Sequence, residues 1–540
     1  MSDEHMPATL PALFAAQVKH RGARDAVVTL SESVSYAELD RRSAELARAL
    51  LELGAGKGAR IALLSSDGIF WMTAFLASMR IGALVSLVST LVTPHELRHI
   101  LRNSDTQILI AERRFLRHDY VVTLEEALPA LADAEAGRLR LADAPHLRSI
   151  WLDDAEGVPW AASVDELRAL AQRPGAPDAA LLQAVENEVT PGDEAVIVYT
   201  SGSTSAPKAV VHTQWTLARH PREVARYFLL QPDDRMMPLL PVFWLGGLVM
   251  ALETLSVGAT LVYPQTPEQE VVLETIERCA VNRLNSWGDM LFKLRAAAKE
   301  RGIDVDSIVG LGEFRDENGE LIPPQLCTNP LGMSETFAVH SAEPLNVRLP
   351  EDKAGAAGRT VHGYERRVVD PETGEEVAAG EVGELQLRGG GLMHGFYKVD
   401  RRKVFTPDGF YPTGDLVRVD ADGYLFFVAR RGDMIKTRAA NVSRLEVEEA
   451  LRALPEVELP VVTGLPDVEL GERVVAAVVP AAGCTPNAAE LQQALRKRLS
   501  SYKVPRDIVF ITEAEIPRTS TGKLKLNEIG AMIAGKLDKA

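Results

Sequence analysis

Strand-like and helix-like segments alternate through the first 270 residues of this chain. The apolar stretches RIALLSS (60–66) and QILIAE (107–112) are typical of strands, whereas residues 35–58 and 95–105 have the three- and four-residue apolar spacing of helices. Strands separated by helices are joined by crossover connections, which place the strands parallel to one another. We therefore expect an α/β fold with mainly parallel sheets covered by helices.

The pattern changes after about residue 360, where short strands alternate with turns rich in Gly and Asp, as in ERRVVDPETGEEV, GELQLRGG and GYLFFVARRGD. This pattern of short strands and turns predicts a small β-rich subdomain. A compact α+β pattern follows Asp433, and 540 residues exceed what one ordinary core accommodates. We predict a large domain over residues 1–430 and a small mobile α+β domain over 431–540, with the junction at Arg430–Asp433.

Charge and cysteine content narrow the class of protein. The formal net charge of −16 argues against a general nucleic-acid-binding protein. Cys279, Cys327 and Cys484 lie too far apart for a metal-ligand motif or a disulfide framework.

The N-terminus is acidic and polar, unlike a signal peptide, so we expect a cytoplasmic protein. The apolar window 70–92 is interrupted by Arg80, which favours a buried helix and strand over an integral membrane segment.

A loop rich in small hydroxylated residues follows one of the expected strands. VYTSGSTSAPKAV (198–210) leaves the apolar run 195–199 and ends in a lysine, Lys208. Such a loop exposes N–H and O–H donors that suit phosphate oxygens, with the lysine as a point charge. Because these residue types also dominate turns, an ordinary strand-to-helix turn fits equally well. The loop is not a Walker A motif, since Lys208 is not followed by Ser or Thr.

The order of residues in this loop resembles the phosphate loop of the adenylate-forming superfamily, which comprises acyl-CoA synthetases, adenylation domains of nonribosomal peptide synthetases and firefly-type luciferases. Five further stretches match in the same order: PVFWLGGL (241–248) resembles the acyl-pocket motif, LGMSET (331–336) the aromatic-Gly-x-Thr-Glu motif, YPTGDL (411–416) the Tyr-x-Thr-Gly-Asp motif, RRGDMIK (430–436) the segment that follows it, and PRTSTGK (517–523) the catalytic-lysine loop. Ordered matches over more than 300 residues argue against coincidence and favour the phosphate-binding interpretation.

The resemblance implies a free-standing carboxylic acid–CoA ligase that uses ATP, Mg²⁺ and coenzyme A. A carboxylate would attack the α-phosphorus of ATP to give an acyl-adenylate and pyrophosphate, and a thiol would then attack the activated carbonyl and release AMP. Because two anions meet in the first step, the site must supply cations and N–H donors.

The same resemblance implies a role for individual residues. Lys523 would bridge the carboxylate and the α-phosphate, Glu335 would ligate Mg²⁺ with help from the Thr204 hydroxyl, and Asp415 would accept hydrogen bonds from the ribose hydroxyls. The residues implied to bind ATP are Thr200, Ser201, Gly202, Ser203, Thr204, Lys208, Ser334, Asp415 and Arg430. Those implied to line the acyl pocket are Trp244, Gly246 and Gly247. Gly432 falls at the hinge, and Arg438 and Ala439 lie in the vicinity of coenzyme A.

Several positions depart from the family pattern. Ser205 and Ala209 replace glycines of the phosphate loop, which restricts the backbone there. Leu331 stands where an aromatic residue precedes the glycine, and residues 310–330 do not align with the adenine loop. Trp244 takes the place of a frequent histidine and would narrow the acyl tunnel.

Three further points stay open on the residues alone. Trp287 fits the acyl tunnel and plain core packing equally well. Arg438 and Ala439 replace glycines beside pantetheine, which puts the coenzyme A half-reaction in question. The apolar WLGGLVMAL stretch admits fatty, aromatic and steroid-like acids.

The alternatives within this fold are an acyl-AMP ligase that passes its product to a carrier-protein thiol and a catalytically inactive nucleotide-binding relative. No carrier module is evident in the seventeen residues after Lys523, and no acidic residue that would hold the ammonium of an amino acid is evident at Trp244–Gly247. The expected partner is a small-molecule carboxylic acid rather than nucleic acid, and a homodimer is compatible with the family.

Overall fold

The computed structural model describes residues 7–200, 208–285, 289–431, 434–437, 440–467, 471–499, 503–518 and 524–538. The chain forms two compact units, the first comprising Met1–Arg366 with Leu387–Tyr411 and the second Arg367–Gln386 with Pro412–Ala540. This grouping differs from the predicted boundary at residue 430, because it assigns residues 412–430 to the second unit. A separate domain over residues 431–540 therefore stays a prediction.

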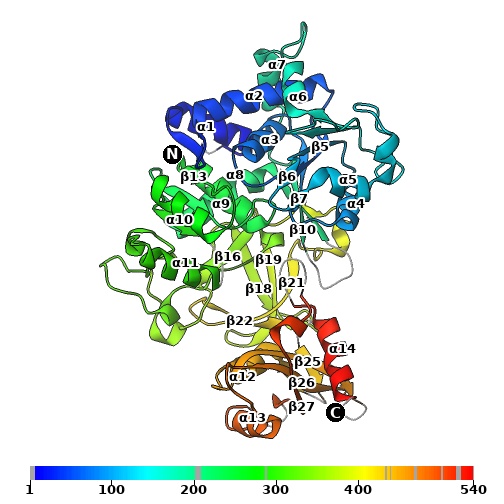
Figure 1. Ribbon diagram of the computed structural model, residues 1–540. Coiled ribbons are helices and arrows are strands. Elements are labelled where there is room, and N and C mark those ends of the chain that lie inside the picture. The colour runs from blue at the N-terminus through cyan, green and yellow to red at the C-terminus, as the bar shows by residue number, and fades with distance from the viewer. Residues whose placement is uncertain are drawn as a thin grey trace. The chain divides into compact units, whose positions relative to one another are not determined.

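The largest sheet described in the first unit has eight strands, of which β5 and β10 are labelled in Figure 1. Its strand order is β20-β11-β10-β4-β3-β5-β8-β9. The bounds are β3 Arg60–Leu64, β4 Leu84–Leu87, β5 Ile108–Ala111, β8 Ser149–Leu152, β9 Ala162–Ser163, β10 Glu194–Thr200, β11 Lys208–Thr213 and β20 Gly395–Phe396. The six strands from β10 to β9 are parallel, whereas β11 and β20 add antiparallel strands at one edge. Every residue of β4 and β5 is buried, as expected for parallel strands covered on both faces.

A second sheet of the first unit has the strand order β14-β12-β13-β1-β2. Its bounds are β1 Asp25–Val28, β2 Ser33–Ser35, β12 Arg235–Pro238, β13 Thr260–Val262 and β14 Arg283–Asn285. All pairings except that of β1 with β2 are parallel. The prediction of mainly parallel sheets is therefore confirmed for this unit.

Helices pack against both of these sheets. Their bounds are α1 Leu10–Arg21, α2 Tyr36–Glu52, α3 Ile69–Arg80, α4 Pro94–Asn103, α5 Tyr120–Ala127, α6 Val164–Leu170, α7 Ala179–Asn187, α8 Gln214–Tyr227, α9 Leu245–Val257, α10 Gln269–Arg278 and α11 Asp289–Glu300. The window 70–92 folds as α3 followed by β4, as predicted. Arg80 at the end of α3 is buried and forms an ion pair with Glu186 at 2.5 Å. Among the described residues, no helix has both the length and the apolar character needed to cross a membrane.

The β-rich region predicted after residue 360 forms a four-stranded sheet of order β18-β19-β21-β22. Its bounds are β18 Tyr364–Val369, β19 Val382–Gly389, β21 Tyr411–Val419 and β22 Leu425–Arg430. A smaller antiparallel sheet of the first unit consists of β15 Leu331–Met333, β16 Ala338–Ala342 and β17 Arg359–Thr360. A short hairpin, β6 Arg114–Phe115 and β7 His118–Asp119, completes this unit.

The C-terminal residues of the second unit form a sheet of order β24-β23-β26-β25, with β27 parallel to β26. The bounds are β23 Met434–Thr437, β24 Ala440–Ser443, α12 Arg444–Arg452, β25 Val457–Asp467, β26 Gly471–Pro480, α13 Ala488–Leu495, β27 Asp507–Phe510 and α14 Leu526–Leu537. Alternate residues of β26 enter two cores, since Val474 and Ala476 pack with α12 and α13, whereas Val475 and Ala477 pack with α14. Figure 1 shows α12 and α14 on opposite sides of β25 and β26. This is the predicted α+β fold.

Candidate active site

The predicted phosphate loop connects two antiparallel strands. Strand β10 ends at Thr200, β11 begins at Lys208, and these two residues are partners in the register. The strand-to-helix alternative is therefore wrong, because α8 begins only after β11. The predicted ligands Ser201, Gly202, Ser203 and Thr204, together with Ser205, lie outside the described residues.

Lys208 lies above an aromatic ring at the edge of the sheet. Its side chain is exposed, and its Nζ is 5.3 Å from the ring centroid of Phe396 in β20. The next residue of β11, Ala209, is hydrogen-bonded to the residue after Phe396, because Tyr397 N donates to Ala209 O at 2.8 Å. Ala209 is buried against Ile197 and Val211, so its methyl group fills core space where the family has a glycine.

The LGMSET motif forms a tight reversal between β15 and β16. Ser334–Thr336 form one turn of 3₁₀ helix, followed by two left-handed residues, Phe337 at φ 47° and Ala338 at φ 76°. The backbone of Gly332 passes so close to β16 that a Cβ there would lie 2.0 Å from Ala338 O. Only glycine fits this position, which explains why the motif carries one.

Each carbonyl of this turn accepts a hydrogen bond from a different part of the first unit. His212 Nε2 lies 2.8 Å from Ser334 O, Met393 N donates to Glu335 O at 2.7 Å, and Tyr364 Oη donates to Thr336 O at 2.5 Å. The Glu335 side chain is half-buried, and its Oε1 is 3.4 Å from the Tyr411 hydroxyl. Glu335 therefore carries its carboxylate on a turn whose backbone is fixed at three points.

Three buried histidines surround this turn, and sequence reasoning missed all of them. Burial lowers the pKa of His212 to about 3, of His220 to about 4 and of His340 to about 3, so all three rings are neutral at physiological pH. The edge of the His212 ring contacts Phe337 at a centroid distance of 4.7 Å, and His220 contacts Tyr364 at 5.3 Å. The sequence offered a signal for His212, because this histidine follows the apolar residues of the strand pattern AVVH (209–212).

The second unit brings together the predicted ribose-binding residues. Asp415 in β21 and Arg430 in β22 are register partners, and Arg430 Nε lies 2.9 Å from Asp415 Oδ1. Asp415 is buried, whereas Arg430 is exposed over about half of its side chain. Thr413 supports the motif, because its hydroxyl donates to Leu385 O at 2.8 Å and accepts from Asp415 N at 3.0 Å.

The predicted acyl-pocket residues lie at the first turn of α9. Trp244 is the residue before the helix; it is half-buried and packs edge-on against Phe243 at 5.5 Å. Gly246 and Gly247 follow in the first turn. A Cβ on Gly247 would lie 2.2 Å from Pro241 O and 2.3 Å from Leu240 O, so the close approach of helix and loop requires a glycine.

An acidic residue that sequence reasoning missed adjoins this segment. Val242 N donates to Asp67 Oδ1 at 2.9 Å. Burial raises the pKa of Asp67 to about 7, and the nearby Glu112 adds to this effect. The sequence showed no acid at Trp244–Gly247, but Asp67, 175 residues before Val242, contacts the same loop.

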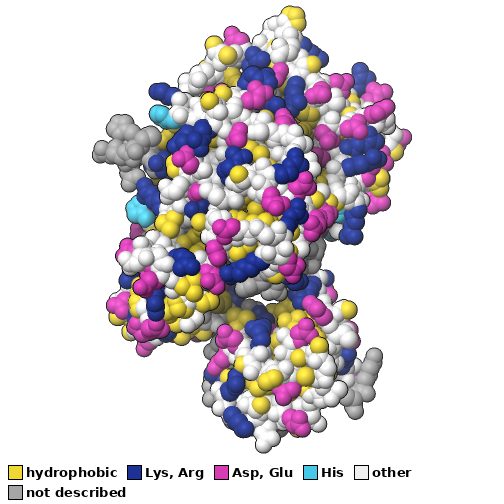
Figure 2. Space-filling model, turned by 60° about the vertical axis from the view of Figure 1, so that its left-hand side comes forward, with side chains coloured by type: hydrophobic (Ala, Val, Ile, Leu, Met, Phe, Trp, Pro, Cys, Tyr) yellow, Lys and Arg dark blue, Asp and Glu magenta, His cyan; other side chains and the backbone are white. Residues whose placement is uncertain are grey.

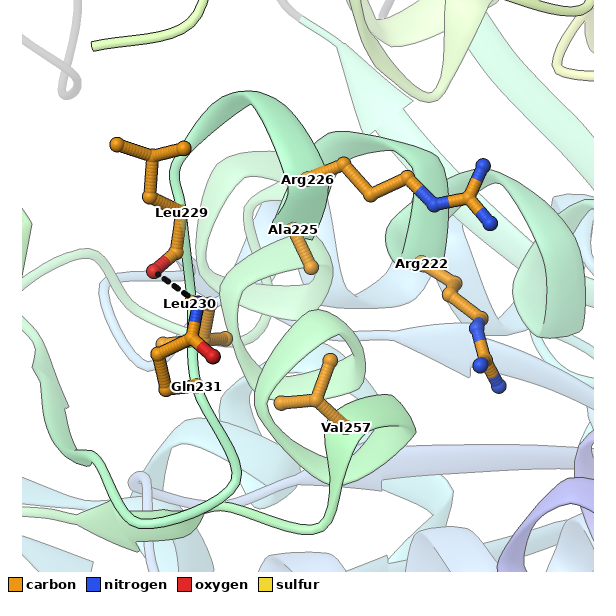
Figure 3. Close-up of a pocket in the computed structure, with 7 residues that line it drawn as sticks. All are labelled: Arg222, Ala225, Arg226, Leu229, Leu230, Gln231 and Val257. Carbon is orange, nitrogen blue, oxygen red and sulfur yellow. Dashed lines mark hydrogen bonds between the residues drawn. The ribbon is translucent and has the colours of Figure 1, made fainter. Parts of the chain in front are cut away.

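A pocket elsewhere in the first unit contains none of the predicted site residues. It has a volume of about 310 Å³ and lies between α8, the following turn and the end of α9. Figure 3 shows Leu229, Leu230 and Gln231 on one side of Ala225 and Val257, and the guanidinium groups of Arg222 and Arg226 extending away on the other side. The pocket and the Glu335 turn are therefore separate features.

The remaining predicted residues, Lys523, Gly432, Arg438, Ala439 and Trp287, lie outside the described residues. Within the described part of the chain, no cluster of three or more His, Cys, Asp or Glu side chains could hold a metal ion. The lone Glu335 carboxylate fits magnesium, a hard cation that is often bound through one or two carboxylates, waters and substrate phosphates.

Comparison with known proteins finds two family domains in this chain and several similar ligases. Residues 14–397 match the family described as AMP-binding enzyme, and residues 446–523 match the AMP-binding enzyme C-terminal domain. The chain is 30% identical over 539 residues to the 3-hydroxybenzoate–CoA/4-hydroxybenzoate–CoA ligase of Thauera aromatica, which covers 96% of this chain and 95% of that protein. It is 28% identical over 516 residues to the indoleacetate–CoA ligase of Aromatoleum aromaticum, covering 93% of this chain and 94% of that one.

The fold is also found among solved structures. The crystal structure of an anthranilate CoA ligase in complex with anthranoyl-AMP has a TM-score of 0.75, at 22% identity and 99% coverage of both chains. The chain therefore belongs to the AMP-binding enzymes of the adenylate-forming superfamily, as an acid–thiol ligase of the acyl-CoA synthetase type.

Proposed function

We propose that this protein joins an aromatic or arylalkanoic carboxylic acid to coenzyme A through an acyl-adenylate. The observation that carries the proposal is the Glu335 turn, whose Ser334 carbonyl contacts His212 of β11, the strand that begins at the end of the phosphate loop. Family membership supports the same type of reaction. The acids named for the two relatives, hydroxybenzoate and indoleacetate, support the aromatic class.

In the proposed first step, the acid's carboxylate attacks the α-phosphorus of ATP and pyrophosphate leaves. Lys208 and the hydroxyl groups at Thr200–Thr204 would bind the β- and γ-phosphates. Lys523 would donate to the carboxylate and the α-phosphate where negative charge accumulates. Asp415 would accept hydrogen bonds from the ribose hydroxyls, with Arg430 holding its carboxylate in orientation.

Glu335, assisted by Thr204, would hold a magnesium ion, which neutralises phosphate charge when bound. The half-buried Glu335 carboxylate offers the oxygen ligands that magnesium prefers. The protein's own contribution would be to position that carboxylate through the backbone of the turn, whose three carbonyls are hydrogen-bonded.

In the proposed second step, the thiol of coenzyme A attacks the acyl carbonyl and AMP leaves. Coenzyme A is preferred to a carrier protein as the acceptor because the reported relatives are CoA ligases. Trp244 at the start of α9 would present its ring to the acyl group, which suits an aromatic acid. We place this reaction in the cytoplasm, where ATP and coenzyme A are available.

A panel of acids tests the proposal. Benzoate, hydroxybenzoates, indoleacetate, octanoate and malonate would each be assayed for AMP release with and without coenzyme A, and for ATP–pyrophosphate exchange. We expect an aromatic acid to have the highest kcat/KM, at least about tenfold above octanoate and malonate, the order of discrimination that a shaped apolar pocket supplies.

Three outcomes would contradict parts of this proposal. A preference for octanoate or malonate would refute the aromatic class. Exchange without AMP release on addition of coenzyme A, together with transfer to a carrier protein, would refute the acceptor. Absence of exchange with every acid, under conditions where the hydroxybenzoate relative is active, would indicate the inactive nucleotide-binding alternative.

A further inference from the structure

The Glu335 turn adopts a backbone conformation that its own sequence does not favour. Phe337 and Ala338 both have positive φ, a region that is unfavourable for residues with a side chain. Such a conformation persists only where neighbouring groups determine it. Gly332 contributes the close approach of β15, but the carbonyls of the turn need donors from elsewhere.

His212 supplies the donor on one side of Glu335. A carbonyl oxygen only accepts hydrogen bonds, so the 2.8 Å contact with Ser334 O assigns the proton of this neutral ring to Nε2. The ring is fully buried in β11, and its edge contact with Phe337 fixes its plane. One side chain therefore contacts the residue before Glu335 and the left-handed residue that ends the turn.

Tyr364 supplies the donor on the other side. Its hydroxyl donates to Thr336 O at 2.5 Å, and its ring is buried at the start of β18. His220 packs edge-on against this ring, and Gly391 approaches so closely that a Cβ there would lie 2.0 Å from Tyr364 Oη. The hydroxyl therefore has little freedom to leave the Thr336 carbonyl.

We propose that His212 and Tyr364 are positioning residues that aim the Glu335 carboxylate by holding the carbonyls of Ser334 and Thr336 on either side of it. Neither side chain is placed on substrate, nucleotide or metal. Their effect reaches the reaction only through the direction in which the turn presents Glu335. The inference rests on the proposed function, because it takes Glu335 to be the residue that holds magnesium.

The test compares variants that remove each donor with variants that keep it. His212→Leu and Tyr364→Phe remove the donors, whereas His212→Gln keeps an N–H donor at a similar reach. His340→Gln is the matched control, since His340 is another buried neutral histidine but bonds to Ser341 Oγ at 3.0 Å and not to the turn. Glu335→Gln is the reference for loss of the metal ligand.

For each folded variant, ATP–pyrophosphate exchange would be measured against magnesium concentration at saturating acid and ATP, with thermal unfolding as the check on folding. We expect His212→Leu and Tyr364→Phe each to raise the half-saturating magnesium concentration about tenfold, as loss of groups that orient a metal ligand does. The KM for the acid should stay within about twofold, because its binding residues are untouched. His212→Gln should recover most of the loss, and His340→Gln should leave the magnesium dependence unchanged.

The outcomes separate this inference from the proposed function. If Glu335→Gln raises the magnesium requirement but His212→Leu and Tyr364→Phe do not, the positioning role is refuted and the role of Glu335 stands. If Glu335→Gln itself leaves the magnesium requirement unchanged, the proposed metal role of Glu335 is refuted. Should His212→Leu fail to fold, Tyr364→Phe, which removes a single oxygen atom, decides the question.

Discussion

Glu253 lies in α9, and its carboxyl group is buried. Both of its carboxyl oxygens are inaccessible and without a hydrogen-bond partner among the described residues. Burial raises its pKa to about 8, and the charge of Arg283 offsets only part of that rise. The group is therefore protonated in the folded protein at neutral pH, where the same side chain in the unfolded chain is ionised.

This carboxyl predicts a pH-dependent stability. Because the folded state binds the Glu253 proton more tightly than the unfolded state does, the free energy of unfolding falls as the pH rises from about 4.5 to about 8. Glu253→Gln removes this titration. We expect the variant and the parent protein to have similar stability at pH 5, and the variant to be more stable by about 1–3 kcal/mol at pH 8.5.

Thermal or urea unfolding of both proteins over pH 5–9 measures this difference. Other titrating groups, Asp67 among them, are common to the two proteins and cancel in the comparison. Stability curves that run parallel across this pH range would show that Glu253 does not titrate with a raised pKa.

At the scale of elements, the first turn of α9 depends on one glycine. A side chain at Gly247 would collide with the carbonyl oxygens of Leu240 and Pro241, which are backbone atoms and cannot rotate away. We expect Gly247→Ala to displace the start of α9, to destabilise the protein by about 1–3 kcal/mol and to lower kcat/KM for the acid at least about tenfold.

Gly535→Ala, in a different helix, is the matched control for the Gly247→Ala substitution. Gly535 lies in α14, where an added Cβ would meet nothing within 4 Å, so alanine there should stabilise by up to about 1 kcal/mol through its higher helix propensity. Thermal unfolding and acid-dependent pyrophosphate exchange measure both variants. A Gly247→Ala protein with normal stability and normal acid kinetics would contradict the structural requirement.

At the scale of the whole molecule, the residues that we propose for the reaction are distributed over both compact units. Lys208, Ser334 and Glu335 belong to the first unit, whereas Asp415, Arg430 and Lys523 belong to the second. Acidic and basic side chains are interspersed on the face that Figure 2 shows, and the C-terminal lysines Lys525 and Lys536 form ion pairs with Glu528 and Glu515. Among the described residues, this face therefore has no extended basic area.

A prediction at this scale concerns Lys523. We expect Lys523→Ala to slow acyl-adenylate formation by about two to three orders of magnitude, as loss of a donor to developing charge does. Thioester formation from a supplied acyl-adenylate should be affected much less, because the α-phosphate bond is already made. Lys525→Ala is the control, since Lys525 Nζ bonds to Glu528 Oε1 at 2.8 Å. An equal loss in both half-reactions would assign Lys523 a structural role.

The sequence by itself determined the features that are coded locally or by ordered motifs. Apolar patterning predicted β3, α4, β5 and β10 close to their observed bounds, because apolar spacing reports burial within one element. The motif order indicated the family, and it implied ATP-binding roles for Asp415 and Arg430, which form an ion pair in the structure. These inferences needed no knowledge of how distant segments pack.

Only the tertiary structure decided which distant residues support the site. His212 and Ser334 are 122 residues apart, and Asp67 and Val242 are 175 apart, yet each pair is hydrogen-bonded. Nothing local marks such partners, because a buried donor and its acceptor are matched by packing and not by sequence spacing. The antiparallel pairing of β10 with β11 was likewise hidden, since a strand's pattern shows its burial but not the direction of its neighbour.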